Sequence, residues 1–208
     1  FGIGISGVST SYGSRYAKIN YQKEGWNLAS RFTGYQTFDT TLTNSNQPYD
    51  VLPELGINKR WDNNYINYDI RSTISKWNHI TKVDGVRSDF QFGIDKTFLM
   101  KGINVKPRIK IQHTSYDLEN QTAGLSSSPS KTIPIFSLDS EMTFSKQIAK
   151  TNLAHQIKPR IFYLYSPKRN QNDIPIFDTG LNEFSFAQLF RDNSFSGLDR
   201  NSDSNQVS

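Results

Sequence analysis

Hydrophobic and polar residues alternate along most of the chain, with a period of two residues. Over residues 103–112 the apolar positions are Ile103, Val105, Ile109 and Ile111, and the polar positions are Asn104, Lys106, Arg108, Lys110 and Gln112. Residues 66–75 and 86–98 repeat this alternation. Successive side chains of a β-strand point to opposite faces, so the pattern predicts strands with one apolar and one polar face. Helical periodicity is almost absent, which predicts an all-β fold.

The alternating segments predict nine strands or parts of strands. They cover residues 1–8, 15–22, 26–38, 51–61, 65–76, 86–99, 103–116, 133–146 and 153–165. Several are longer than ten residues, whereas strands of soluble proteins are most often about 5–6 residues long. A strand that crosses a bilayer needs about 9–11 residues. Strand length therefore favours a membrane barrel over a soluble β-sandwich or a large twisted sheet, which remain alternatives.

The segments between the predicted strands alternate in length. Short connections fall at 23–25, 62–64, 100–102 and 147–152, and long ones at 39–50, 77–85, 117–132 and 166–204. Transmembrane β-barrels have short periplasmic turns and longer extracellular loops. We therefore expect an antiparallel transmembrane β-barrel fragment, with about nine strands of a larger barrel. Residues 1–208 would be part of a single outer-membrane β-barrel domain, with a long extracellular or luminal loop at 166–204.

Aromatic and proline residues refine this interpretation. Trp26 and Trp61 each lie next to a short turn, as expected for an aromatic girdle at a membrane interface. The position of Trp77 in the alternation points it inward. Pro107 and Pro159 fall inside predicted strands. Proline cannot donate to a strand ladder, so we expect a bulge or broken pairing at both positions.

The polar face carries an excess of basic residues. The chain has 24 Lys and Arg against 19 Asp and Glu, a net charge of +5. The alternation assigns ten cations to the barrel interior: Lys18, Arg31, Arg60, Arg71, Arg87, Lys106, Arg108, Lys110, Lys158 and Arg160. It assigns six acids to the same face: Glu54, Asp69, Asp89, Asp95, Asp139 and Glu141. This face is either a solvated wall of mixed charge or a path for an anionic molecule, such as a phosphorylated lipid.

Residue types that carry catalysis or bind metals are scarce. The chain has no cysteine and three histidines, which lack metal-ligand spacing and any recognisable catalytic partner. The mean hydropathy is −0.61, and the longest apolar run, residues 161–165, is far shorter than the roughly 20 residues of a membrane-spanning helix. We therefore expect no enzymatic activity, no cofactor, no metal and no nucleic-acid partner.

The final predicted loop carries the most distinctive sequence. It contains Leu189-Phe190-Arg191-Asp192 and Gly197-Leu198-Asp199-Arg200, followed by Asn205-Gln206. With Lys158-Pro159-Arg160 in the strand before it, this segment resembles the barrel of the LptD family of lipopolysaccharide-assembly proteins. The match is most specific over residues 153–206. Over residues 1–150 it rests on strand order and spacing.

The resemblance implies a function. Members of the family receive lipopolysaccharide from a periplasmic bridge protein and deliver it to the outer leaflet of the Gram-negative outer membrane, with an LptE-like plug lipoprotein inside the barrel. No bond is made or broken. The expected partners are lipopolysaccharide, the plug, the bridge protein and outer-membrane lipids. This chain would be an interior portion of the barrel, and the jelly-roll domain, gate strands and disulfide cysteines would lie outside it.

The charge pattern and the loop sequence lead to two hypotheses and leave one alternative function open. The cations of the polar face would favour passage of phosphorylated head groups, and the 166–204 loop would fold back over or into the barrel. Within that loop we expect a structural motif that holds it in place, made of Phe190, Arg191, Asp192, Gly197, Leu198, Asp199 and Arg200. A general outer-membrane porin is the alternative function, since it fits the barrel pattern but not the loop sequence.

Overall fold

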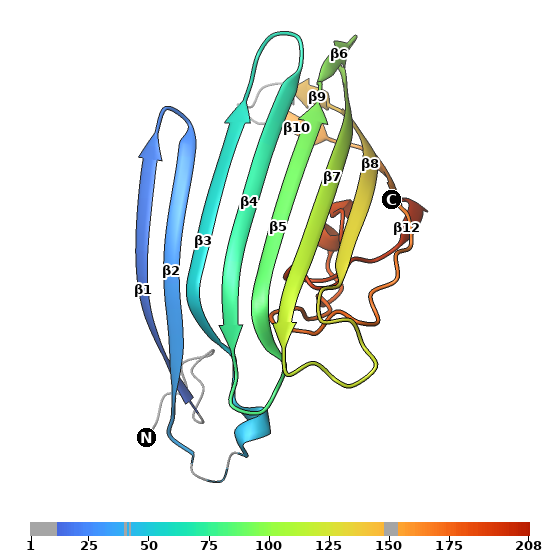
Figure 1. Cartoon of the computed structure of the whole chain (residues 1–208). Helices are drawn as coiled ribbons and strands as arrows, with labels where there is room; N and C mark the ends of the chain where they lie inside the picture. The colour runs from blue at the N-terminus through green and yellow to red at the C-terminus, as the bar shows by residue number, and fades with distance from the viewer. Residues whose placement is uncertain (1–11, 40, 42, 148–153) are drawn as a thin grey trace, which may run out of the picture.

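The computed structural model describes residues 12–39, 41, 43–147 and 154–208. Within them the fold is a large curved antiparallel sheet, a small two-stranded sheet and the long loop 167–203 (Figure 1). The expected strand at 1–8 lies outside the described residues. The sheet has ten strands in the order β1-β2-β3-β4-β5-β7-β8-β11-β12, with β6 paired to β7. β9 and β10 form a separate two-stranded sheet. The prediction of an all-β, antiparallel architecture of about nine strands is confirmed.

The strand bounds follow the predicted alternation closely. They are β1 Tyr12–Lys23, β2 Trp26–Thr37, β3 Asp50–Trp61, β4 Asn67–Asn78, β5 Asp84–Asp95, β6 Phe98–Met100, β7 Ile103–Glu119, β8 Ser130–Met142, β9 Phe144–Gln147, β10 Ala154–Ile157, β11 Arg160–Ser166 and β12 Ser204–Val207. Two short 3-10 helices, η1 (Asn44–Asn46) and η2 (Phe186–Phe190), lie in the connections.

The connections differ from the predicted alternation at one place. Two-residue turns join β1 to β2 and β6 to β7, and each has two residues with positive φ, as in type I′ hairpins. Long connections cover 38–49, 120–129 and 167–203. The predicted long loop at 77–85 is wrong, because strand pairing continues through Trp77 and Gly85. Only residues 79–83 lie between the two strands. This connection is therefore no longer than the turn of residues 62–66 at the other end of the sheet.

Both prolines in predicted strands interrupt the ladder without shifting its register. Near Pro107, β7 pairs with β5 as far as Asp95 and then with β6 from Phe98 onward. The register is the same on both sides of this gap. Pro159 separates β10 from β11, yet Phe144 pairs with Ile157 and Glu141 with Arg160, so one continuous hairpin runs through the gap. The expected broken pairing is therefore present. The register shifts instead lie in β2–β3 and β3–β4, where they span residues 51–54 of β3.

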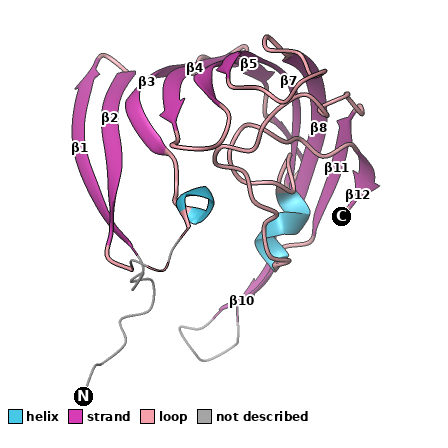
Figure 2. Ribbon diagram, turned by 60° about the horizontal axis from the view of Figure 1, so that its bottom comes forward, coloured by secondary structure: helices cyan, strands magenta, loops and turns pink. Residues whose placement is uncertain are grey.

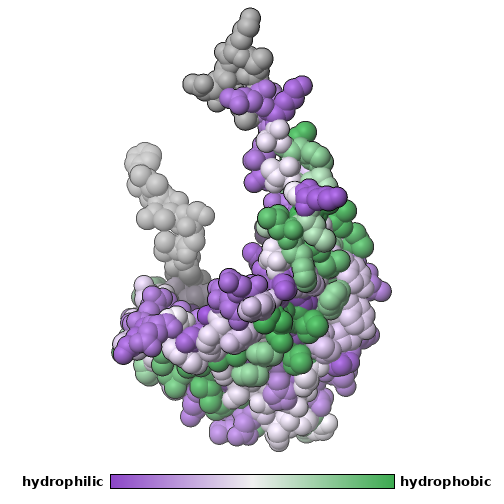
Figure 3. Space-filling view, turned by 90° about the horizontal axis from the view of Figure 1, so that it is seen from above, coloured by the Kyte–Doolittle hydropathy of each residue, from purple (hydrophilic) through white to green (hydrophobic). Residues whose placement is uncertain are grey.

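The two faces of the sheet have different chemistry. Figure 2 shows the 167–203 loop lying within the concave side of the curved sheet. Large apolar side chains on the convex face are 40% to 68% exposed: Ile19, Tyr21, Leu28, Phe32, Leu55, Ile74, Phe90, Ile109, Ile111, Ile161 and Tyr165. In Figure 3 apolar atoms form a band over the outer surface of the strands. No helix among the described residues is long and apolar enough to cross a membrane.

Aromatic residues gather at the short-turn end of the convex face. The rings of Trp26 and Trp61 lie edge to face, 5.7 Å apart, and Tyr68 stacks on Trp61 at 5.1 Å. The Nζ atom of Lys59 lies 4.8 Å from the ring of Trp26 and 5.0 Å from that of Trp61. A lysine above aromatic rings at a strand end matches the girdle expected from the sequence.

The buried core lies between the concave face and the loop. One cluster joins strand residues Val51, Trp77, Tyr116 and Leu118 to loop residues Ile174 and Phe177. The other consists of Ile133, Ile135, Phe162 and Leu164, with Phe190 packed against it. The expectation that the apolar side chains of the strands face outward does not hold for the strand residues of these two clusters. There, loop side chains cover the concave face and exclude water from it.

Candidate functional site on the concave face

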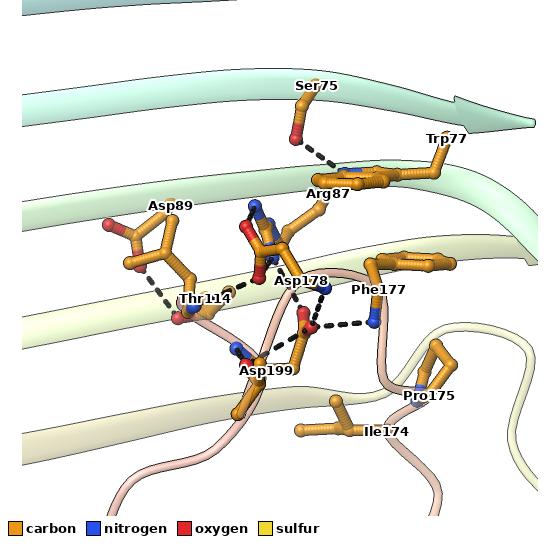
Figure 4. A network of polar contacts seen from close by, with 12 residues as sticks. Ser75, Trp77, Arg87, Asp89, Thr114, Ile174, Pro175, Phe177, Asp178 and Asp199 are labelled. Atoms are coloured by element: carbon orange, nitrogen blue, oxygen red, sulfur yellow. Dashed lines mark hydrogen bonds and ion pairs between the residues drawn. The ribbon is translucent and has the colours of Figure 1, made fainter. Parts of the chain in front are cut away.

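The loop is anchored to the sheet by a buried ionic network (Figure 4). Arg87 of β5 is 1% exposed and donates hydrogen bonds to Asp178 at 2.7 and 2.8 Å and to Asp199 at 2.7 Å. Asp199 is completely buried and also accepts hydrogen bonds from the Tyr116 hydroxyl at 3.0 Å and the Phe177 backbone amide at 2.7 Å. A buried charge is tolerated only when it is paired and hydrogen-bonded, and both groups meet this condition.

Aromatic packing surrounds this network. The Phe177 and Trp77 rings are stacked 5.2 Å apart at an angle of 3°, and Tyr49 lies edge-on to Phe177 at 5.1 Å. The Tyr49 hydroxyl donates to the Val83 carbonyl at 3.0 Å. Burial, together with the charges of Asp84 and Asp199, raises the pKa of Tyr49 to about 12. The 38–49 and 79–83 connections therefore pack with the long loop at the same end of the sheet.

A buried lysine fixes the loop from the other side. The Nζ atom of Lys131 in β8 donates to the Leu198 carbonyl at 2.8 Å, to Asn201 Oδ1 at 2.6 Å and to Gln171 Oε1 at 3.2 Å. Lys131 is 4% exposed. Its three donors therefore each have an acceptor from the loop, which satisfies a cation that would be costly to bury alone.

Backbone geometry closes the loop on itself. Gly197 has φ +65°, and a Cβ there would lie 2.3 Å from Asp178 Oδ1. Arg200 donates to the Ile174 carbonyl at 2.6 Å and to the Pro175 carbonyl at 3.3 Å. Gly197, Leu198, Asp199 and Arg200 of the predicted loop motif thus lie where residues 174–180 and 193–202 meet. Phe190 instead packs against the cluster of β8 and β11, and Asp192 pairs with Lys110.

A second ionic network lies on the concave face toward the short turns. The carboxylate of Asp95, whose side chain is 0% exposed, accepts from Arg60 at 2.9 and 3.0 Å and from Arg108 at 2.8 Å. Arg108 also donates to Asp69 at 2.7 Å, and Lys106 lies 3.5 Å from Asp95. Cations and acids from β3, β4, β5 and β7 here neutralise one another across the sheet.

Further ion pairs continue across the sheet and onto the loop. Arg31 pairs with Glu54 at 3.1 Å, and Arg160 pairs with Asp139 at 2.7 Å. The Arg160 guanidinium also lies 4.1 Å from the centre of the Phe190 ring. Lys110 forms an ion pair with Asp192 of the loop.

The ten cations predicted for the interior thus fall into two groups. Seven have an acidic partner: Arg31, Arg60, Arg87, Lys106, Arg108, Lys110 and Arg160. Lys18, Arg71 and Lys158 are exposed and have no acidic partner among the described residues. Arg87 is covered by the loop, so it is not accessible from the concave side. Among the charged residues of the loop motif, Arg191 is the one whose side chain makes no hydrogen bond or ion pair with the described residues.

Several residues of these networks were not anticipated from the sequence. Asp178 was not singled out, and Trp77 was noted only as an aromatic pointing inward. Lys131 was not assigned to the polar face, although it lies two residues from Ile133 on the same side of β8. The predicted connection 117–132 contains it, and the available signal was that Lys131 occupies an odd position, as Asp139 of the polar face does. In the described residues, no group of His, Cys, Asp and Glu side chains could hold a metal ion.

The geometry first defines a class of protein. A curved antiparallel sheet of long strands, apolar on its convex face and charged on its concave face, is the wall of a β-barrel fragment. Comparison with known proteins then identifies the family. The family model described as LptD, LPS transport system D, matches residues 1–208. This chain belongs to the LptD family.

Curated relatives agree with this assignment. The LPS-assembly protein LptD of Nitrosococcus oceani is 32% identical over 213 residues, covering 100% of this chain and 29% of the relative. Those of Methylococcus capsulatus and Hahella chejuensis are 34% and 30% identical and are covered over 19% and 25% of their length. They are matched over 92% and 91% of this chain. The chain therefore spans less than a third of the length of these relatives.

Proposed function

We propose that this chain forms part of the wall of an outer-membrane β-barrel that delivers lipopolysaccharide to the outer leaflet. Residues 1–208 would belong to one barrel domain. The observation that supports this proposal is the difference in chemistry between the two faces of one sheet. An exposed convex face of Ile, Leu, Phe and Tyr side chains suits contact with outer-membrane lipids, whereas the charged concave face suits a water-filled interior.

The transported molecule in this proposal is inferred from the names of the relatives. They are LPS-assembly proteins, and lipopolysaccharide combines acyl chains with a phosphorylated sugar head group. Lys18, Arg71 and Lys158 are interior cations without an acidic partner in the part of the chain that the structure describes, and such a wall suits a head group of this charge. No covalent step is required of these residues. An LptE-like lipoprotein inside the barrel and a periplasmic bridge protein would be partners of the whole parent protein.

Depletion of the full-length parent protein tests the proposal. Lipopolysaccharide at the cell surface is labelled while the parent is depleted, and insertion of an unrelated outer-membrane barrel is measured as a control. We expect surface lipopolysaccharide to fall and to accumulate inside the envelope while the control barrel still inserts. Unchanged surface lipopolysaccharide with reduced uptake of small solutes would instead make the parent a general porin.

A further inference from the structure

A small hollow on the concave face lies over β1 to β4, away from the loop networks. It has a volume of about 180 Å³. Its floor is formed where Ala29 pairs with Gly56 and Gly56 pairs with Thr73. Three adjacent strands thus place small side chains side by side, which leaves a depression in the wall. We call it the β1–β4 hollow.

The rim of the β1–β4 hollow is cationic. Lys18, Arg31 and Arg71 line it, together with the single acid Glu54. Lys18 and Arg31 are directly opposite each other on β1 and β2. Like charges in this position destabilise a strand pair unless something neutralises them. Glu54 pairs with Arg31 at 3.1 Å, so the two remaining cations leave a net charge of +2 within the described residues.

This surplus distinguishes the hollow from the other charged regions of the wall. Around Asp95, each of the cations Arg60, Lys106 and Arg108 already has an acid within 3.5 Å. An incoming anion there would have to compete with a buried carboxylate. In the β1–β4 hollow it would meet Lys18 and Arg71, because the acid there, Glu54, is paired with Arg31. The side chains of Asn58 and Thr73 line the same hollow as further donors.

We propose that the β1–β4 hollow binds a phosphate group of a phosphorylated glycolipid in transit, an inference that rests on the proposed function. Arg71 would donate paired hydrogen bonds to two phosphate oxygens, the geometry in which guanidinium groups recognise phosphate. Lys18 would supply a second charge from the opposite side of the hollow. The Ala29 and Gly56 floor would let the phosphate approach the backbone closely.

Photo-crosslinking in the full-length parent protein, purified from the outer membrane with its partners, tests this assignment. The photoreactive amino acid p-benzoylphenylalanine replaces Asn20, an exposed β1 residue beside the hollow that pairs with Ala29 and lies two residues from Lys18. The probes are intact lipopolysaccharide and the same lipopolysaccharide with its phosphates removed. We expect about tenfold more crosslinking of the intact form, because two charge-assisted hydrogen-bonding groups are engaged. Equal crosslinking of the two forms would overturn the proposal.

A double variant and a matched control locate the effect. Lys18→Gln combined with Arg71→Gln should lower crosslinking of intact lipopolysaccharide to the level of the dephosphorylated form. Lys23→Gln removes a charge from the same strand as Lys18, at an exposed position 4.0 Å from Glu24, and should leave crosslinking unchanged. If the double variant does not fold, the proposal is still tested by comparing the two forms of lipopolysaccharide on the protein that carries only the photoreactive residue.

Competition separates the sources of phosphate. Vesicles of phosphatidylglycerol and inorganic phosphate are added in excess during crosslinking. Little competition from either supports recognition of the glycolipid, whereas full displacement by phosphatidylglycerol would make the ligand a glycerophospholipid and overturn the proposal. Suppose that depletion of the parent lowers surface lipopolysaccharide even though intact and dephosphorylated lipopolysaccharide crosslink equally. In that case the proposed phosphate site is wrong and the proposed function stands.

Discussion

The Asp199 carboxylate connects three segments of the chain that are distant in sequence. It accepts hydrogen bonds from Arg87 of β5, from Tyr116 of β7 and from the backbone amides of Phe177 and Asp178. Because its oxygens are buried, each unmade contact would carry a desolvation cost. The loop therefore docks in one arrangement, and residues that shape the backbone around Asp199 control that docking.

Gly197 is the residue where backbone shape matters most. We expect Gly197→Ala to destabilise loop docking by at least about 1–2 kcal/mol, because the residue has positive φ and the added Cβ would collide with Asp178. Limited proteolysis of residues 167–203 in the parent protein measures the effect. The control is Gly180→Ala in the same loop, where the nearest side-chain atom to a Cβ is 3.6 Å away. Equal protease resistance of both variants would contradict the prediction.

Asp178 should make loop docking sensitive to acid. Burial raises its pKa, but the hydrogen bonds and charge of Arg87 outweigh burial and hold the pKa below its ordinary value. A depressed folded-state pKa adds stability above the unfolded pKa of about 4. This stability is lost as the pH falls through the folded value.

We therefore expect the loop to become protease-sensitive below about pH 4, while the strands stay folded. An acid-stable protease measures cleavage of 167–203 as the pH is lowered. Asp178→Asn should already be loosened at neutral pH and should show a weaker pH dependence. If the loop becomes protease-sensitive at the same pH in the variant and in the unaltered protein, a group other than Asp178 causes the acid response.

At the scale of the elements, the alternation of residues predicted the strands because each face has one dominant environment. It assigned Arg87, Asp95 and Arg108 to one face, and there the structure pairs Arg87 with Asp199 and Arg108 with Asp95. It could not predict that Ile133 and Leu164 are buried on that face, since the residues that cover them belong to a distant loop. The partner of Arg87 was equally hidden, because 91 residues separate it from Asp178 and no local spacing links them.

The two faces of β5 should respond oppositely to a new charge. Phe90 is on the convex face and 48% exposed, whereas its neighbour Gln91 is on the concave face. We expect Phe90→Arg to destabilise the folded barrel in membranes by about 2–4 kcal/mol, the cost of a cation at mid-depth on a lipid-facing strand. Gln91→Arg is the control and should be tolerated much better.

The folded fraction of each variant is measured in the parent protein, by its shift in gel mobility on heating after extraction from the outer membrane. A folded fraction of Phe90→Arg equal to that of Gln91→Arg would mean that the convex face does not meet lipid. The proposed placement in the membrane would then be wrong.

At the scale of the whole molecule, the sheet and the loop form one unit with the loop on the inner side. Strands that curve around residues 167–203 share two hydrophobic clusters and a buried ionic network with them (Figure 2). A loop attached by buried charges and apolar packing is not free to leave the interior at low cost. This arrangement predicts that the loop restricts passage through the barrel.

Replacing residues 170–200 by a short Gly-Ser linker in the parent protein should therefore make the outer membrane more permeable to bulky antibiotics. The variant also carries Ile133→Ser and Leu164→Ser, so that the uncovered concave face does not expose large apolar side chains. The control shortens the exposed 122–125 segment of the β7–β8 connection and should leave permeability unchanged. If cells with correctly folded loop-deleted protein exclude the antibiotics as well as the control, the barrel is closed by another element, and residues 167–203 stabilise the wall without blocking it.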